Sequence, residues 1–226
     1  MNRAFVRLVT CAALSVAAFS ANALTLNLTG YANGSVNASG GAPAFNTNAG
    51  AFVGNITAPD FAANPFYTYC VQLTQGFGFG SLPNYTIDGG VNYFNNVLPT
   101  LPSNGTVIAD RLGKLFTYLG GIGMPASATQ SAAIQLAVWE SIYEGANVLG
   151  LGSGLFSATS SAAVVSAANT MLAGASALAT SVYHIKVLKN ADLQDFILVV
   201  PEPTSVALVA LALTGLALSR RRRRAP

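Results

Sequence analysis

The stretch Thr129–Gly145, TQSAAIQLAVWESIYEG, decides the fold because it predicts one long helix near the middle of the chain. Residues on one face of this helix recur at helical spacing. They are Ile134, Gln135, Val138, Trp139 and Ile142. Ser127 suits the start of a helix and Gly145 its end. The stretch therefore predicts a helix whose apolar stripe packs against the rest of the domain.

Gln135 is a polar residue at a position where this stripe favours an apolar one. A buried amide needs hydrogen-bond partners, and sequences break such local rules most often at functional sites. Gln135 is therefore a candidate functional residue. Glu140 and Glu144 share another face of the helix, four residues apart. We expect a solvated face there, with a general acid–base pair as the alternative.

The segments on both sides of this helix complete the expected fold. A second helix is predicted over Thr106–Leu119 and a third over about Ser160–Ala179. Ser39–Gly50 is rich in glycine, alanine and asparagine and is predicted to be a loop. Strand patterns occupy residues 24–38, 51–58, 66–73, 182–188 and 193–200. The order predicts an α+β domain: a β-rich, sandwich- or barrel-like part with an inserted helical part of about three helices.

The N-terminal residues 1–23 have the pattern of a secretory signal peptide, expected to be helical. Arg3 and Arg7 precede an apolar run over Leu8–Phe19, and Ala21 and Ala23 form a small-residue cleavage site. The run is shorter than the ~20 residues that a membrane-spanning helix needs. We expect cleavage after Ala23 and export by the Sec route, with an uncleaved anchor as the alternative.

The C-terminal end combines three features in a fixed order. Pro201, Glu202 and Pro203 come first, and residues 204–219 then form an uncharged apolar segment that predicts a transmembrane helix. A basic cluster follows at once: Arg220, Arg221, Arg222, Arg223 and Arg224. An apolar helix backed by arginines is typical of an anchor whose basic end stays in the cytoplasm. A simple tail anchor is the alternative.

Residues 201–226 resemble the PEP-CTERM sorting tail, a segment also catalogued as an ice-binding-protein C-terminal motif. The resemblance implies that an exosortase in the inner membrane recognises the tail and cleaves near the motif. It also implies a Gram-negative host that makes exopolysaccharide. The protein would be anchored in the inner membrane for a time and then reach the cell surface or the extracellular matrix.

Residues 24–200 remain as one domain of mildly acidic character. Its basic residues are Arg111, Lys114, Lys186 and Lys189, and its acidic residues are Asp60, Asp88, Asp110, Glu140, Glu144, Asp192 and Asp195. The chain's pI of about 9.0 therefore reflects the two ends and does not indicate nucleic-acid binding. The sequence has no clustered metal ligands and suggests no cofactor.

Cysteine usage singles out Cys70. Cys11 lies in the predicted signal peptide, so Cys70 is the one cysteine expected in the exported domain. An unpaired cysteine in an exported protein is a candidate reactive thiol or intermolecular partner. His184 is the only histidine in the chain, and a Cys–His dyad is conceivable.

Two motifs together resemble the thioester domains of bacterial surface adhesins. They are Phe66–Leu73 (FYTYCVQL) and Gln135–Trp139 (QLAVW). The resemblance implies an extracellular thioester-like domain over residues 24–200, with an internal thioester between Cys70 and Gln135. Tyr69 and Trp139 would shield it from water. Many such domains have an acidic residue just beyond the cysteine, whereas position 72 here is glutamine.

Such a domain would attach covalently, and once, to an amine or hydroxyl group on a target surface, so it would not be a turnover enzyme. The main alternative is a non-covalent matrix protein that binds exopolysaccharide or packs into biofilm without a thioester. A secreted hydrolase is the third possibility. It has less support because the sequence shows no Ser-His-Asp signature.

Overall fold

The computed structural model describes residues 23–41, 43–57, 65–145 and 149–201. This part of the chain contains nine strands and four helices. In chain order they are β1 (Leu24–Tyr31), β2 (Val36–Gly41), β3 (Ala44–Ala49), β4 (Phe52–Thr57), β5 (Phe66–Thr68), β6 (Gly80–Gly89), α1 (Gly90–Asn96), α2 (Gly105–Tyr118), α3 (Ala128–Tyr143), β7 (Ala158–Thr159), α4 (Ala162–Ser176), β8 (Tyr183–Lys189) and β9 (Phe196–Pro201).

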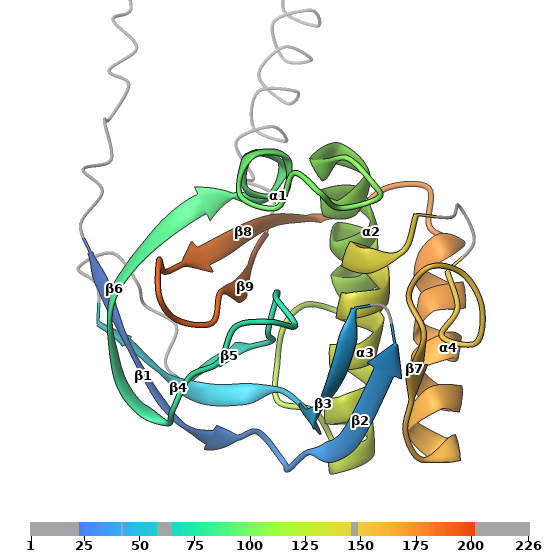
Figure 1. Cartoon of the computed structure of the whole chain (residues 1–226), viewed down its shortest axis with the longest axis horizontal. Coiled ribbons are helices and arrows are strands. Elements are labelled where there is room, and N and C mark those ends of the chain that lie inside the picture. The colour runs from blue at the N-terminus through green and yellow to red at the C-terminus, as the bar shows by residue number, and fades with distance from the viewer. Residues whose placement is uncertain (1–22, 42, 58–64, 146–148, 202–226) are drawn as a thin grey trace, which may run out of the picture.

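Six strands form one antiparallel sheet in the order β5-β4-β1-β6-β8-β9, which curves into a near-barrel (Figure 1). Its two edge strands meet, because Cys70, just beyond β5, forms an antiparallel bridge with Phe196 of β9. Side chains alternate between the two faces of a strand. In β1, accordingly, Leu26 and Leu28 are fully buried while Asn27 is exposed. The barrel-like part predicted from the sequence is confirmed in this form.

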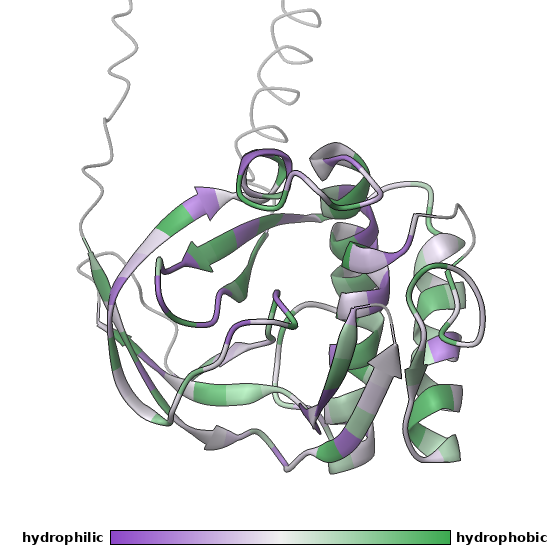
Figure 2. Ribbon diagram, viewed as in Figure 1, coloured by the Kyte–Doolittle hydropathy of each residue, from purple (hydrophilic) through white to green (hydrophobic). Residues whose placement is uncertain are grey.

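The helices lie between β6 and β8 in the chain and pack on one side of the barrel (Figure 1). Helix α3 contacts α2 and α4 and also β2 and β3 of the smaller sheet. Twelve of its 16 residues are buried, so the helix is enclosed on nearly all sides and does not present a single apolar stripe. Hydrophobic residues are frequent on α3 and along β8 and β9 (Figure 2).

The prediction of a loop over Ser39–Gly50 is wrong. This segment contributes to the hairpin of β2 and β3, paired from Val36–Ala49 to Gly41–Ala44, and β7 adds a third strand. The ring of Phe45 lies over Gly40, where a Cβ atom would clash with it. Small residues show no apolar alternation, so hydrogen bonding across the hairpin and to β7, rather than a hydrophobic pattern, makes these strands. Likewise α1 is a fourth helix beyond the three predicted.

The two ends of the chain fall mostly outside the described residues. This is the case for the predicted signal peptide apart from Ala23, and for the predicted transmembrane helix 204–219. Of the predicted sorting residues, Pro201 ends β9, whereas Glu202, Pro203 and the five arginines are outside. No helix in the described part is long and apolar enough to span a membrane.

Candidate functional site

Cys70 lies in a short segment held on one side by β9. The backbone N–H of Ile197 donates to the carbonyl oxygen of Tyr69 at 3.0 Å, and the N–H of Val71 donates to the carbonyl oxygen of Asp195 at 2.9 Å. Residues 69 and 71 therefore direct their backbone groups towards β9. The backbone groups of Cys70 between them point the other way and need a different partner.

Gln135 is that partner. Its side chain is fully buried, as the sequence predicted. The Cys70 N–H donates to Oε1 of Gln135 at 2.9 Å, and Nε2 of Gln135 donates to the Cys70 carbonyl oxygen at 3.0 Å. The side-chain amide thus pairs with Cys70 as a neighbouring strand would. The structure brings together the two residues predicted to form a thioester, although they are 65 positions apart in the chain.

The local sequence explains why Gln135 reaches this point. The Ser127 side chain accepts a hydrogen bond from the Gln130 N–H and so fixes the start of α3, as predicted. Ser131, one turn before Gln135, accepts a hydrogen bond at 2.7 Å from the N–H of Ala51. This second bond ties the same face of α3 to the start of β4. The first half of α3 is therefore tied to the barrel one turn before the amide.

The Cys70 thiol is nearly enclosed, with 9% of the residue exposed. It is the only free cysteine within the described residues. Burial raises the pKa of the thiol far above its ordinary value, so the protonated form is favoured at neutral pH. The pKa values of Tyr31 and Tyr143 are also raised, mainly by burial and further by the nearby Cys70. Both phenol groups therefore lie close enough to Cys70 for an electrostatic interaction with its thiol.

Tyr69 and Trp139, the two residues predicted to shield the site, are both buried. The ring of Tyr69 packs against Phe116 of α2 with a centroid distance of 6.1 Å. The ring of Trp139 packs against Phe45 of β3 at 5.3 Å. Their role in excluding water stays a prediction. The indole Nε1 of Trp139 has no hydrogen-bond partner among the described residues.

Sequence reasoning missed a buried polar network beside Cys70. Nε2 of Gln72 donates at 2.9 Å to the Asp195 carboxylate and at 2.9 Å to the Tyr93 hydroxyl. The Tyr93 hydroxyl donates to the same carboxylate, which also accepts from the N–H of Asn190 at 2.7 Å. Burial raises the pKa of Asp195, and these hydrogen bonds oppose the rise. The sequence feature that could have indicated this network is Asp195, an aspartate directly before the apolar run FILVV.

This network includes position 72, where the resemblance to thioester domains predicts an acidic residue. The chain has Gln72 there, and the fold brings the carboxylate of Asp195 against its amide. Asp195 also accepts the Val71 N–H through its backbone carbonyl. The residues that follow Cys70 are therefore anchored to β9 through both backbone and side chain.

The expectation that Glu140 and Glu144 form a solvated face is wrong, because both residues are buried. Oε1 of Glu140 accepts the N–H of Gly150 at 2.7 Å, and Oε2 of Glu144 accepts the N–H of Phe156 at 3.1 Å. The two carboxylates thus hold the loop between α3 and β7. Burial raises the pKa of Glu140 to about 7.

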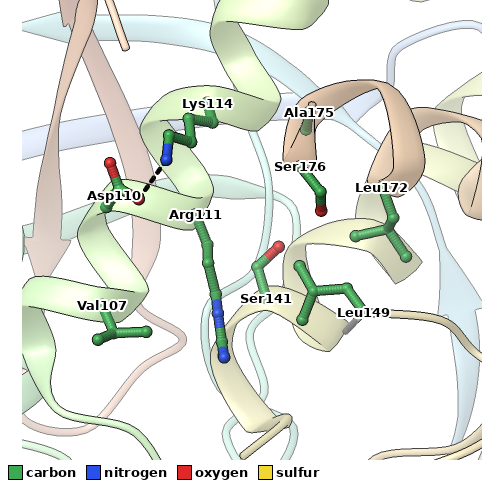
Figure 3. A pocket seen from close by; sticks show the side chains of 9 residues that line it. All are labelled: Val107, Asp110, Arg111, Lys114, Ser141, Leu149, Leu172, Ala175 and Ser176. Carbon is green, nitrogen blue, oxygen red and sulfur yellow. Dashed lines mark ion pairs between the residues drawn. The ribbon is translucent and has the colours of Figure 1, made fainter. Parts of the chain in front are cut away.

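A small cavity of about 180 Å³ lies between α2, α3 and α4, near these carboxylates (Figure 3). Arg111 and Lys114 of α2 line it together with Ser141 and Leu172. Lys114 is paired with Asp110 at 2.9 Å, and Arg111 donates to the backbone carbonyl of Glu144 at 2.6 Å. Both cations are thus engaged within the fold, so the cavity gives no sign of a separate site.

His184 lies in β8 opposite Val200 and lines an open groove beside α1 and α2. Cys70 bridges Phe196, four residues before Val200 along β9, so the Cys–His dyad gains no support. Within the described residues, no group of three or more His, Cys, Asp or Glu side chains could hold a metal ion.

The C-terminal residues 199–224 match the PEP-CTERM protein-sorting motif. The chain therefore carries the tail of an exported protein that an exosortase processes, transiently anchored in the membrane and sorted to the cell surface. The match covers the tail alone and leaves the domain before it unassigned. No curated protein and no solved structure matches the chain.

Proposed function

We propose that residues 24–200 form a surface module that stores an internal thioester between Cys70 and Gln135 for covalent attachment to a target. The observation that carries the proposal is the two-point pairing of the Gln135 amide with the Cys70 backbone. This pairing holds the amide next to the residue that carries the thiol. The resemblance to thioester adhesins supports the same assignment.

The proposed chemistry has two balanced steps. In the first, Sγ of Cys70 attacks Cδ of Gln135, the C–N bond breaks, and the thiol proton leaves with the amide nitrogen as ammonia. In the second, an amine or hydroxyl of the target attacks the thioester carbon. The C–S bond breaks, an amide or ester forms on the Gln135 side chain, and the target's proton returns to Cys70.

The surroundings favour the first step through position and electrostatics. The Cys70 N–H already donates to the oxygen on which negative charge would develop, which is the task of an oxyanion-hole donor. Fixed geometry also supplies the large effective concentration of an intramolecular reaction. The raised thiol pKa works against the step, because only a small fraction of the thiol is ionised. We therefore expect slow, single maturation during or after folding.

Intact mass tests the proposal on residues 24–201, which contain every described helix and strand. The wild-type domain should be lighter by one ammonia than its composition requires, and it should add one methylamine. Cys70→Ala and Gln135→Ala should show the mass of their composition and add no methylamine. A wild-type domain that has the mass of its composition and adds no methylamine would exclude the thioester.

A non-covalent matrix protein is the second candidate, and one observation favours it. Both polar ends of the Gln135 amide are already satisfied by hydrogen bonds, as in an ordinary buried amide. On this proposal the domain would be retained at the surface by sorting and would bind exopolysaccharide without a covalent bond. Unmodified mass together with retention in the matrix would support it.

The sorting of the chain can be tested separately. Deletion of residues 201–226 should release the protein into the medium or leave it unsorted, because the motif that matches lies in this tail. Unchanged delivery of the truncated protein to the surface would contradict the assignment.

A further inference from the structure

The sorting motif begins inside the folded domain. Its match starts at residue 199, and residues 199–201 are the last three of β9. They pair antiparallel with the start of β8, where Val200 is opposite His184 and Pro201 is opposite Tyr183. Antiparallel pairing holds opposite Cα atoms about 5 Å apart. The first residues of the motif are therefore fixed in the sheet.

Tyr183 joins this end of the sheet to the helices. Its hydroxyl donates at 3.2 Å to the backbone carbonyl of Gly120, just beyond the end of α2. Gly113 of α2 lies so close to the carbonyl oxygen of Tyr183 that a Cβ atom there would clash with it. Helices α1 and α2 both contact β8 (Figure 1). The start of the motif thus has a fixed position relative to both helices.

An open groove of about 690 Å³ lies directly beside the start of the motif. Tyr183 and His184, which pair with the last two residues of β9, both line it. The other walls come mainly from α1 and α2. Exposed side chains that line the groove include Val91, Asn92, Asn96, Thr106 and Lys186. The groove is therefore continuous with the part of the motif that lies in β9.

Little chain separates the groove from the region where the tail is cleaved. Pro201, Glu202 and Pro203 are followed directly by the apolar segment 204–219. Three residues span at most about 11 Å, even when fully extended. Because an enzyme is much wider than this distance, an exosortase that cleaves near the motif must contact the face of the domain on which β9 ends.

We propose that the groove beside Tyr183 and His184 is a docking surface for the exosortase that processes the tail. Its lining favours a protein over a lipid surface. Among the described residues that line it, there is one lysine, Lys186, and no arginine, whereas an anionic membrane attracts clusters of basic residues. The exposed amides and hydroxyls can form the hydrogen bonds typical of a protein interface. The proposal rests on the sorting motif and is independent of the thioester.

The rate at which the full-length chain is processed tests the docking surface, in the bacterium that produces the chain and its exosortase. Asn96→Arg places a long charged side chain in the groove and should slow processing about tenfold. The Asn96 side chain donates to Asn92 of the same helix, so the change spares the packing between elements. The matched control is Asn55→Arg, the same change at an exposed position of β4, which should be processed like the wild type.

Photocrosslinking identifies what occupies the groove. A benzophenone amino acid in place of Asn96 should crosslink the full-length chain to an epitope-tagged exosortase, and the same group in place of Asn55 should not. Equal processing of wild type and Asn96→Arg, equal slowing by Asn55→Arg, or crosslinks from position 96 to lipid alone would overturn the docking surface. A wild-type chain that is never cleaved would overturn the sorting assignment as well.

Discussion

Helix α3 carries two buried polar sites that differ in kind. On its barrel side, the Gln135 amide is neutral and both of its polar ends are paired with one residue, Cys70. On its loop side, Glu140 and Glu144 are ionisable, and Oε2 of Glu140 has no hydrogen-bond partner among the described residues. One helix thus buries a pH-independent pairing at Gln135 and a pH-dependent carboxylate at Glu140 less than two turns further along. Only the first sits beside a nucleophile.

The largest effect is expected where the barrel-side pairing is broken. Gln135→Leu leaves the N–H and C=O of Cys70 buried without partners, so the free energy of unfolding should fall by about 4 kcal/mol. Urea denaturation of residues 24–201 measures it. Cys70→Ala keeps both backbone groups paired and serves as the reference, because the thioester can form in neither variant and the difference between them isolates the pairing. A loss below about 1 kcal/mol for Gln135→Leu would show that the pairing contributes little.

The loop-side carboxylates should make stability depend on pH. Because burial raises the pKa of Glu140 to about 7, the folded state binds more protons than the unfolded state between about pH 4.5 and 7. The free energy of unfolding should therefore fall, by about 3 kcal/mol, as the pH rises through this window. Asp195, whose pKa is also raised, acts with the same sign.

Glu140→Gln isolates the contribution of Glu140 to the pH dependence of stability. The variant should lose most of the fall between pH 4.5 and 7, as measured by urea denaturation at a series of pH values. Gln135→Leu should keep the fall, since an amide does not titrate. A pH profile identical in wild type and Glu140→Gln would contradict the assignment of the titration to this residue.

A smaller effect should follow from disturbing the loop that the carboxylates hold. Gly154 has a φ of +103°, and a Cβ atom there would clash with the Glu144 carboxylate. Gly154→Ala should therefore lower the free energy of unfolding by about 2 kcal/mol. Gly78→Ala, where a Cβ atom would meet nothing, is the matched control. Equal thermal stability of the two variants would argue against a tightly held loop.

The smallest effect concerns the start of α3, which positions both sites. Ser127→Ala removes the side chain that accepts the Gln130 N–H and should cost about 1 kcal/mol in thermal or urea unfolding. Ser161→Ala removes the equivalent cap of α4 and should cost a similar amount. Only Ser127→Ala should slow the release of ammonia, because only α3 carries Gln135.

The sequence was sufficient for features that depend on local pattern. The helix predicted over Thr129–Gly145 is α3, Ser127 is its N-cap, and Gln135 is buried with its amide paired. Each of these follows from side-chain chemistry that is readable within a single turn of helix. Strands without an apolar alternation were out of reach, such as β2 and β3, whose small and polar residues form a hairpin through backbone pairing.

Two misjudged positions have the same physical origin. Glu140 and Glu144 were expected in solvent because carboxylates seldom lie in a core, yet backbone N–H groups of a distant loop satisfy them. Asp195 is likewise held by Tyr93 and Gln72, which come from two separate segments. Burial of a charged group depends on partners that only the fold brings together, so a local sequence pattern cannot predict it.

Peptide mapping tests the central claim, the bond between Cys70 and Gln135, most directly. Trypsin cleaves residues 24–201 after Arg111, Lys114, Lys186 and Lys189, so Cys70 and Gln135 fall in different peptides. If the thioester forms, mass spectrometry will find peptides 24–111 and 115–186 joined and lighter by one ammonia, and methylamine will separate them and remain on Gln135. Two separate peptides of unmodified mass, with an intact Gln135 amide and a free Cys70 thiol, would contradict it.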